Sequence, residues 1–224
     1  MSRNRIFCFF TALLCALSFA PRACAEPAEP ELASEAAILM DASTGQILYA
    51  KNAWERLYPA SITKILTALL VIEHCNLDDV VTFSHDAIYS VEQGSSSAGM
   101  DVGDQMTVRD CLYAMLLKSA NEVANALAEH TAGSIQDFAV LMNAKARELG
   151  MDDTHFCNCT GLTAGGHVTS AHDIALMSRE LIRKHPDIRT YTTIWMDTLR
   201  DGTFQLANTN KLIRFYDGAT GLKT

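Results

Sequence analysis

The sequence predicts an α+β fold, in which an antiparallel sheet is flanked by helices and carries a helical subdomain. Three observations predict it: strand patterns near the beginning, a helix-rich middle with recognisable N-terminal caps, and a second strand pair near the end. With 224 residues, 49% of them hydrophobic, the chain is long enough for one domain with a sizeable core. Its net charge of -8 argues against nucleic acid as a partner, because backbone binding needs a basic surface.

The N-terminal segment 1–25 is predicted to be a signal peptide for export. Two arginines precede an apolar run over 6–20, and a small-x-small triplet ends at Ala25. The alternative is a transmembrane anchor, but the run is shorter than the roughly 20 residues that span a bilayer. We therefore expect an extracytoplasmic protein, located at the cell wall or the outer face of the cytoplasmic membrane, with an extended leader over 26–34.

Four cysteines lie beyond the predicted signal peptide: Cys75, Cys111, Cys157 and Cys159. An even number outside the cytoplasm permits disulfides without requiring them. A zinc site at 155–159 is an alternative, yet no second ligand pair at metal-site spacing follows it. We expect buried or incidental thiols and no metal ion.

The strand and helix patterns follow one another in a clear order. Two short apolar runs, 36–40 and 46–50, flank turn residues at 41–45 and predict a β-hairpin. The apolar spacing then becomes helical and predicts a buried helix over about 61–74. Near the end, the runs 194–199 and 204–207 flank a turn and predict a second hairpin.

Helices in the middle of the chain are predicted by their caps. A serine or threonine stands three residues before an aspartate at three places: Thr107, Ser134 and Ser170. The second of these helices should end at Gly150, because glycine is common just past a helix C-terminus. A further helix is expected over 121–130.

Ser61 and Lys64 form an S-x-x-K pattern at the start of the first predicted helix. Residues three apart share a helix face, so the amine can reach the hydroxyl. A lysine can activate a serine when burial or a nearby cation lowers its pKa, and a helix N-terminus favours an oxyanion. The alternative is an N-cap serine followed by a solvated lysine.

Two other short motifs are weak on their own. Ser119-Ala120-Asn121 lies where one helix pattern ends and the next begins, so that Ser119 could simply cap the following helix. Lys223-Thr224 at the end of the sequence carries no meaning by itself.

In this order and spacing, the three motifs resemble the S-x-x-K, S-x-N and K-T-G set of penicillin-binding proteins and serine β-lactamases. The resemblance extends from about residue 31 to 224 and is specific to low-molecular-mass D-alanyl-D-alanine carboxypeptidases. The further segments that carry it are 39–45, 59–64, 128–130, 160–162 and 208–212.

The resemblance implies a DD-peptidase fold and a serine acyl-enzyme. Ser61 would attack the bond between the two terminal D-alanines of a peptidoglycan stem peptide, Lys64 would accept its proton, and Ser119 would relay a proton to the leaving amine. β-Lactam antibiotics would acylate Ser61, and the chemistry would need no cofactor. Substrate binding is implied for three residues: Asn121, Lys223 and Thr224.

The sequence departs from the family pattern at its end, where the glycine of K-T-G does not follow Thr224. We therefore expect a C-terminally truncated catalytic domain over 35–224, with an incomplete sheet and weak activity or none. The family continues through more sheet and a C-terminal amphipathic helix, which implies membrane-surface association through a region beyond Thr224.

Two alternative functions stay open. In a class A β-lactamase, a glutamate on a loop after S-x-N activates the deacylating water, and the corresponding region 152–167 contains no glutamate. A non-catalytic penicillin-binding sensor domain would be acylated without turnover. His167 and His172 are expected to be structural, and 94–99 is expected to be a loop near the cleft.

Overall fold

A computed structural model describes residues 30–199, 202 and 204–223. The chain divides into two units, residues 1–33 and 34–224. Only 30–33 of the first unit are described, so the predicted signal peptide and most of the predicted leader lie outside the described residues. All elements below belong to the second unit.

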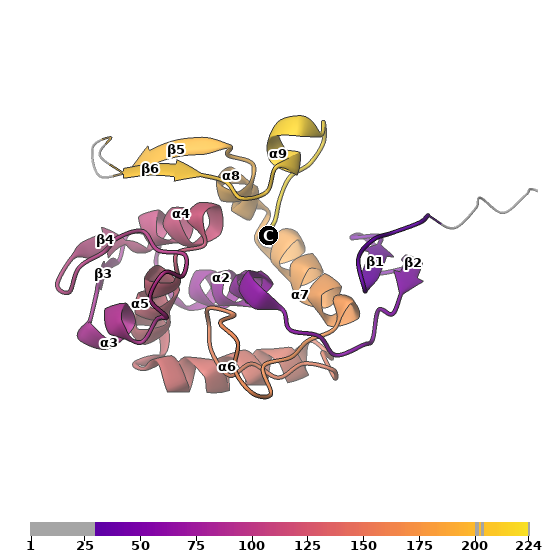
Figure 1. Cartoon of the computed structure of the whole chain (residues 1–224), viewed down its shortest axis with the longest axis horizontal. Coiled ribbons are helices and arrows are strands. Elements are labelled where there is room, and N and C mark those ends of the chain that lie inside the picture. The colour runs from indigo at the N-terminus through magenta and orange to yellow at the C-terminus, as the bar shows by residue number, and fades with distance from the viewer. Residues whose placement is uncertain (1–29, 200–201, 203, 224) are drawn as a thin grey trace, which may run out of the picture. The chain divides into compact units, whose positions relative to one another are not determined.

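The second unit contains both helices and antiparallel strands, which confirms the predicted α+β class (Figure 1). In chain order the elements are β1 (Ala37–Met40), β2 (Ile47–Lys51), η1 (Ala60–Thr63), α2 (Lys64–His74), β3 (Val80–Thr82), α3 (His85–Tyr89), β4 (Gln105–Thr107), α4 (Val108–Lys118), α5 (Asn121–Ala132), α6 (Ile135–Glu148), α7 (Ala171–Lys184), η2 (Pro186–Ile188), α8 (Arg189–Thr192), β5 (Met196–Leu199), β6 (Phe204–Ala207) and α9 (Leu212–Phe215).

Helix α2 forms the centre of the core. It contacts α4, α5, α6 and α7, and every residue from Lys64 to Val71 is buried. A helix that is apolar on all sides is stable only when neighbours cover every face, and the Ile-Leu-x-Ala-Leu-Leu-Val run of α2 meets that condition. Thr67 interrupts the run, and its hydroxyl donates to the carbonyl of Cys159 at 2.8 Å.

The three predicted helix caps are confirmed. The side-chain oxygens of Thr107, Ser134 and Ser170 each accept a hydrogen bond from the backbone N–H of the aspartate three residues on. Those aspartates lie in the first turns of α4, α6 and α7, where a negative charge is favourable. Gly150 follows the end of α6 with a φ of +72°, as a residue just past a helix often does.

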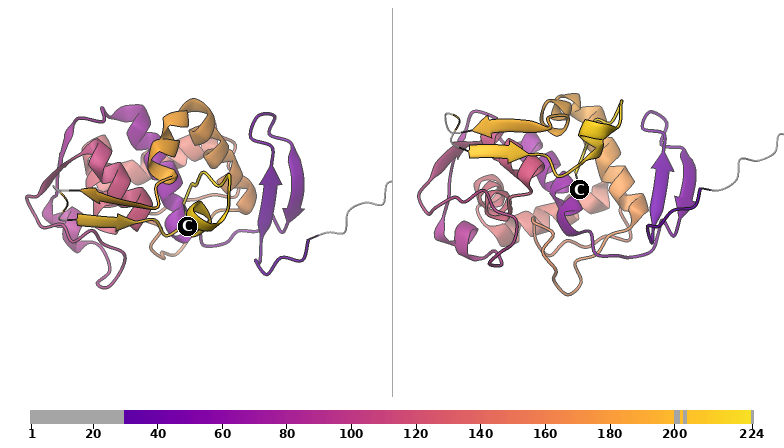
Figure 2. Two further views of the ribbon diagram at one scale, coloured as in Figure 1. Left: turned by 90° about the horizontal axis from the view of Figure 1, so that it is seen from above. Right: turned by 45° about the horizontal axis from the view of Figure 1, so that its top comes forward.

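The strands form three separate two-stranded antiparallel ladders, β1–β2, β3–β4 and β5–β6, among the described residues. Both predicted hairpins are confirmed, whereas the single sheet is not seen, because β1 packs on α7 and β6 packs on α4 (Figures 1 and 2). The β3–β4 ladder was not predicted, since strands of three residues are too short to show an alternating pattern. The turn between β5 and β6 includes 200, 201 and 203, which lie outside the described residues.

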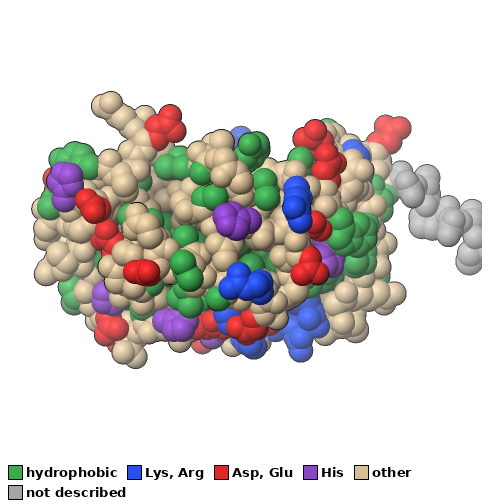
Figure 3. Space-filling model, turned by 90° about the horizontal axis from the view of Figure 1, so that it is seen from below, with side chains coloured by type: hydrophobic (Ala, Val, Ile, Leu, Met, Phe, Trp, Pro, Cys, Tyr) green, Lys and Arg blue, Asp and Glu red, His purple; other side chains and the backbone are tan. Residues whose placement is uncertain are grey.

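Charged side chains of both signs are interspersed on the face that Figure 3 shows. Ion pairs among the described residues include Arg56 with Asp153 at 3.1 Å and Lys145 with Glu73 at 3.0 Å. Within the described ranges, none of the helices has the length and apolar character that a membrane span requires.

Candidate active site

Ser61 lies in η1, directly before α2, and two other side chains contact its hydroxyl. Lys64 Nζ lies 3.4 Å from Ser61 Oγ, and the Ser119 hydroxyl donates to Ser61 Oγ at 2.9 Å. The first contact is long for a hydrogen bond, which is common for catalytic pairs without a bound substrate. The structure therefore confirms the prediction that the Lys64 amine lies close to the Ser61 hydroxyl.

Lys64 is fully buried and has three oxygen partners. Its amine donates to Asn121 Oδ1 at 2.7 Å and to the Thr160 carbonyl at 2.6 Å, and the third contact is Ser61 Oγ. The two short bonds occupy two N–H groups, because neither acceptor can donate to the lysine in this arrangement. Besides its bond to carbon and these two N–H groups, Lys64 Nζ has one tetrahedral position left, and this position faces Ser61. In a neutral amine the lone pair occupies it.

The surroundings of Lys64 favour the neutral amine. Burial, and then the positive charge of Lys223, lower the pKa of Lys64 to about 7, while Cys159 and Glu122 act in the opposite direction. Lys223 is itself buried, and this burial lowers its own pKa to about 8. Among the described residues, Lys64 forms no ion pair with a carboxylate that would hold its proton in place. A lysine in this state can accept a proton near neutral pH.

Ser119 owes its orientation to an unusual backbone conformation. It ends α4 with φ +64°, in the left-handed region, and the chain then turns directly into α5. The N-cap of α5 is Ala120, without a side-chain hydrogen bond, so the alternative that Ser119 caps this helix is wrong. The left-handed turn directs the hydroxyl towards Ser61 instead. This conformation costs a non-glycine residue about 1–2 kcal/mol, which is typical of strain at functional positions.

The C-terminal segment 218–223 returns to lie beside η1 and the start of α2 (Figures 1 and 2). The Thr192 hydroxyl donates to the Thr220 carbonyl at 2.7 Å, and Lys223 Nζ contacts Thr209 Oγ1 at 3.5 Å. These contacts bring Lys223 close enough to Lys64 to affect its charge. Thr224, the last predicted substrate-binding residue, lies outside the described residues.

A cleft of about 390 Å³ opens beside Ser61 and Asn121. Ser95 and Ser96 form part of one wall, so the loop 94–99 lies at the cleft, as the sequence indicates. The segment after Cys159 also lines the cleft, through residues that include Gly161.

Sequence reasoning missed the role of Thr160 and Gly161, because it depends on the backbone. The Thr160 carbonyl holds Lys64, and a carbonyl oxygen leaves no residue-specific signal. The Asn158 side-chain oxygen accepts from the N–H groups of both residues, at 3.2 and 2.8 Å, and fixes the turn. A Cβ added at Gly161 would lie 1.8 Å from the Ala60 carbonyl oxygen, so only glycine lets the turn approach η1.

His167 connects this loop to the Ser61 turn. Its Nδ1 accepts from the Cys157 N–H at 3.0 Å, and its Nε2 lies 2.9 Å from Thr63 Oγ1. Because Nδ1 is an acceptor, the neutral ring carries its proton on Nε2 and donates it to Thr63. Burial, and then His155, lower the pKa of His167 to about 4, which maintains the neutral ring. The geometry agrees with a structural role.

The four cysteines of the second unit are free thiols, and Cys111 and Cys159 are buried. In the part of the chain that the structure describes, no three His, Cys, Asp or Glu side chains gather closely enough to bind a metal ion.

Comparison with known proteins assigns this arrangement to a family. Residues 23–224 match the family Peptidase S11, described as D-alanyl-D-alanine carboxypeptidase. The chain belongs to this family. Similar proteins include the D-alanyl-D-alanine carboxypeptidase DacF of Bacillus subtilis, 43% identical over 222 residues, which are 93% of this chain and 56% of that protein. The D-alanyl-D-alanine carboxypeptidase DacD of Escherichia coli is 37% identical over 169 residues, 72% of this chain and 44% of that protein.

Solved structures support the same assignment. Penicillin-binding protein 6B of Escherichia coli superposes with a TM-score of 0.80 at 34% identity, covering 88% of this chain and 64% of that one. A mutant of the Streptomyces K15 DD-transpeptidase also gives a TM-score of 0.80, at 31% identity, and covers 88% of this chain and 82% of that one. The predicted DD-peptidase-like fold is therefore confirmed. The chain spans about half the length of the curated relatives it matches.

Gly161→Ala should destabilise the protein by at least about 2 kcal/mol, because the methyl group meets the Ala60 carbonyl and the φ of +87° disfavours alanine. Urea denaturation measures the effect. Gly165→Ala is the matched control in the same loop, since its added Cβ meets nothing within 4 Å, and we expect it to stay within about 0.5 kcal/mol of the wild type. Equal unfolding midpoints for the two variants would contradict the close approach of Gly161 to the Ala60 carbonyl.

His167 should make the folded state less stable in mild acid. Its pKa is near 4 when folded and near 6.5 when unfolded, so between these values the unfolded chain binds a proton that the folded chain does not. The His167 contribution is therefore fully present above about pH 6.5 and is lost as the pH falls towards 4. Urea denaturation at several pH values should show that the free energy of unfolding falls less steeply with decreasing pH in the His167→Asn variant than in the wild type. The same slope in both proteins would exclude His167 as the cause.

Proposed function

We propose that the chain contains the catalytic machinery of a serine D-alanyl-D-alanine carboxypeptidase. It would remove the terminal D-alanine from peptidoglycan stem pentapeptides through an acyl-enzyme at Ser61. The single observation that carries the proposal is the contact of Ser61 Oγ with both Lys64 Nζ and Ser119 Oγ beside an open cleft. Membership of the family supports the reaction class.

Acylation begins with attack of Ser61 Oγ on the carbonyl carbon between the two D-alanines. Neutral Lys64 accepts the hydroxyl proton through the position of its nitrogen that faces Ser61. The C–N bond then breaks, and the leaving amine takes the proton from Lys64. We propose that the Ser119 hydroxyl, which donates to Ser61 Oγ in this structure, relays that proton. The products are free D-alanine and an ester on Ser61.

Deacylation reverses the roles of the same groups. A water molecule attacks the ester, Lys64 takes its proton, and Ser61 leaves as the hydroxyl. β-Lactams present a strained amide in place of the D-alanyl bond, and we propose that they acylate Ser61 as well.

Substrate binding is proposed for Asn121, Lys223 and Thr224. Asn121 uses its Oδ1 to hold Lys64, which leaves its amide NH₂ group to donate to the peptide in the cleft. Lys223 carries the positive charge suited to the terminal carboxylate. Thr224 would add a hydroxyl to the same carboxylate.

The proposal includes export and action outside the cytoplasm, where peptidoglycan lies, together with contact of the full-length protein with the membrane surface. Protein recovered from the producing cell should begin near Glu26, because cleavage is expected after Ala25. N-terminal sequencing of the fractionated protein checks this. An intact N-terminus on a cytoplasmic product would contradict export.

In the full-length protein, Ser61→Ala should abolish covalent labelling by a fluorescent penicillin, and Ser119→Ala should mainly slow it. Lys64→Arg should also not be labelled, because a guanidinium group is effectively never deprotonated and cannot accept the Ser61 proton. Labelling that persists in Ser61→Ala would mean that another residue is the nucleophile. Release of D-alanine from a pentapeptide analogue separates the carboxypeptidase from a sensor domain or a β-lactamase.

Acylation should accelerate as the pH rises through about 7 and then level off, because Lys64 acts as a base only after losing its proton. Stopped-flow acylation between pH 5 and 9 measures the profile. In Lys223→Gln the rise should move to higher pH, since one of the two causes that lower the pKa of Lys64 is removed. A flat wild-type profile would exclude Lys64 as the base.

A further inference from the structure

Glu122 is a buried carboxylate directly beside the proposed active site, and none of the steps above uses it. It follows Asn121 at the start of α5 and is only 2% exposed. Its Oε1 accepts hydrogen bonds from Ser97 Oγ at 2.8 Å, from the Ala98 N–H and from the Gly99 N–H at 3.1 Å. Three donors on one oxygen form a small anion-binding nest within the loop.

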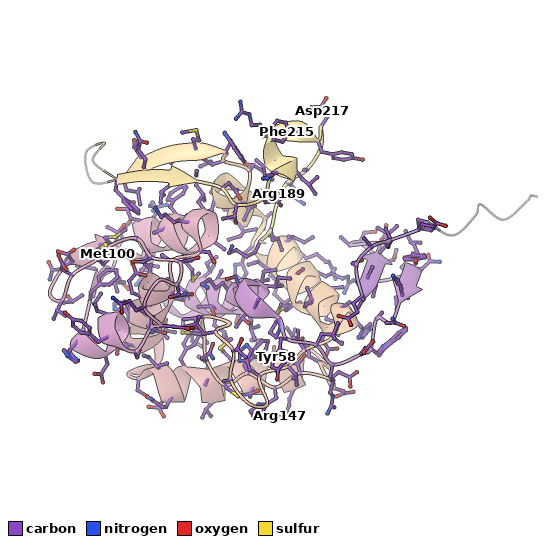
Figure 4. All side chains as sticks on the ribbon, viewed as in Figure 1. Tyr58, Met100, Arg147, Arg189, Phe215 and Asp217 are labelled. Carbon is purple, nitrogen blue, oxygen red and sulfur yellow. The ribbon has the colours of Figure 1, made fainter. Side chains whose placement is uncertain are left out.

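The same stretch of α5 holds the loop at a second point. The Asn121 N–H donates to the Ser96 carbonyl at 2.9 Å, so two consecutive residues of the helix bind residues 96–99. Ser95 and Ser96 line the cleft. The loop continues from here to Met100, labelled in Figure 4, and on to β4. The position of this cleft wall therefore depends on the start of α5.

The charge of Glu122 is not neutralised by an ion pair. Its Oε2 is buried and has no hydrogen-bond partner among the described residues, and no Lys, Arg or His in the described part of the chain forms a salt bridge with it. Its three donors all bind Oε1, and burying a carboxylate without an opposite charge beside it is costly, so its retention points to a role. Its negative charge raises the pKa of Lys64, although burial, Lys223 and Cys159 each have a larger effect on that pKa.

Lys64 is subject to several influences from the elements packed around it. Burial and Lys223, from the C-terminal segment, lower its pKa, whereas Cys159, from the loop after α6, and Glu122, from α5, raise it. Removing the Glu122 charge should therefore lower the pKa of Lys64 further. His167 contacts Thr63, the residue before Lys64, and is kept neutral by its own burial.

We propose that Glu122 is a positioning residue that fixes the loop 96–99 as a wall of the cleft and places a negative charge beside the proposed base. The inference rests on the proposed function, since it assigns Lys64 as that base. A simpler explanation is that Glu122 only stabilises the N-terminus of α5 through the helix dipole. That role needs neither burial nor three donors from another segment, and both are present.

Two substitutions in the full-length protein separate the two parts of the proposal. Glu122→Gln keeps a side-chain oxygen of the same reach for the loop and removes the charge. Glu122→Asp keeps the charge and is one methylene too short to reach all three donors. Glu129→Gln is the matched control, because it removes one charge from the same helix without touching the loop.

For Glu122→Gln, the rise of the acylation rate with pH should move to lower pH, because Lys64 loses its proton more readily. For Glu122→Asp, the profile should stay in place, while acylation slows on the order of 10-fold to 100-fold as the wall is displaced. In this variant the Ala98 and Gly99 amide protons should also exchange faster. Glu129→Gln should match the wild type in all three measurements.

The outcomes distinguish this inference from the proposed function. If the wild-type protein is not acylated by penicillin, the proposed function fails. If it is acylated but Glu122→Gln leaves the pH profile unmoved and Glu122→Asp leaves amide exchange unchanged, the role of Glu122 is overturned. If the Glu122 variants do not fold, Ser97→Ala provides the test with the Ala98 amide as the readout. The substitution removes one donor to the carboxylate and should by itself increase exchange at Ala98, whereas Gly99 is not informative because its N–H also donates to Ser97 Oγ at 2.8 Å.

Discussion

The burial of one lysine is the constraint on which the site depends. An ammonium group inside a protein is costly, and the usual solutions are an ion pair or loss of the proton. Lys64 has no carboxylate ion pair in the described structure, and its amine is held by the Asn121 amide oxygen and the Thr160 carbonyl. The neutral form of Lys64 is therefore favoured, which is the form that its proposed role as a base requires.

Three backbone conformations in the left-handed region make this arrangement possible. Ala60, with φ +47°, precedes the Ser61 turn; Ser119, with φ +64°, ends α4; and Gly161, with φ +87°, follows the carbonyl that holds the lysine. Each lies where a helix begins or ends or where a loop comes close to one. Glycine adopts this conformation readily, whereas Ala60 and Ser119 are strained in it. Their strain persists only when the surrounding structure fixes it, and here the packed core around α2 supplies that support.

The parts of the molecule that could be predicted are local in sequence. The caps at Thr107, Ser134 and Ser170, both hairpins and the Ser61–Lys64 spacing depend on neighbours a few residues away. The contacts that could not be predicted join distant segments through groups without a sequence signal: a carbonyl 96 residues from Lys64 and a histidine 104 residues from Thr63. The sequence gives no sign that Glu122 binds the loop 96–99, because an acidic residue in the first turn of a helix is common.

The two buried lysines gain a common explanation in the proposed mechanism. Without substrate, the charge of Lys223 lowers the proton affinity of Lys64 and so favours the neutral amine. If a substrate carboxylate binds at Lys223, as proposed, its negative charge would offset that effect and raise the proton affinity of Lys64. The proposed base would then be stronger in the step in which Ser61 loses its proton. Recognition of a C-terminal carboxylate and activation of the nucleophile would thus be coupled through a single electrostatic interaction.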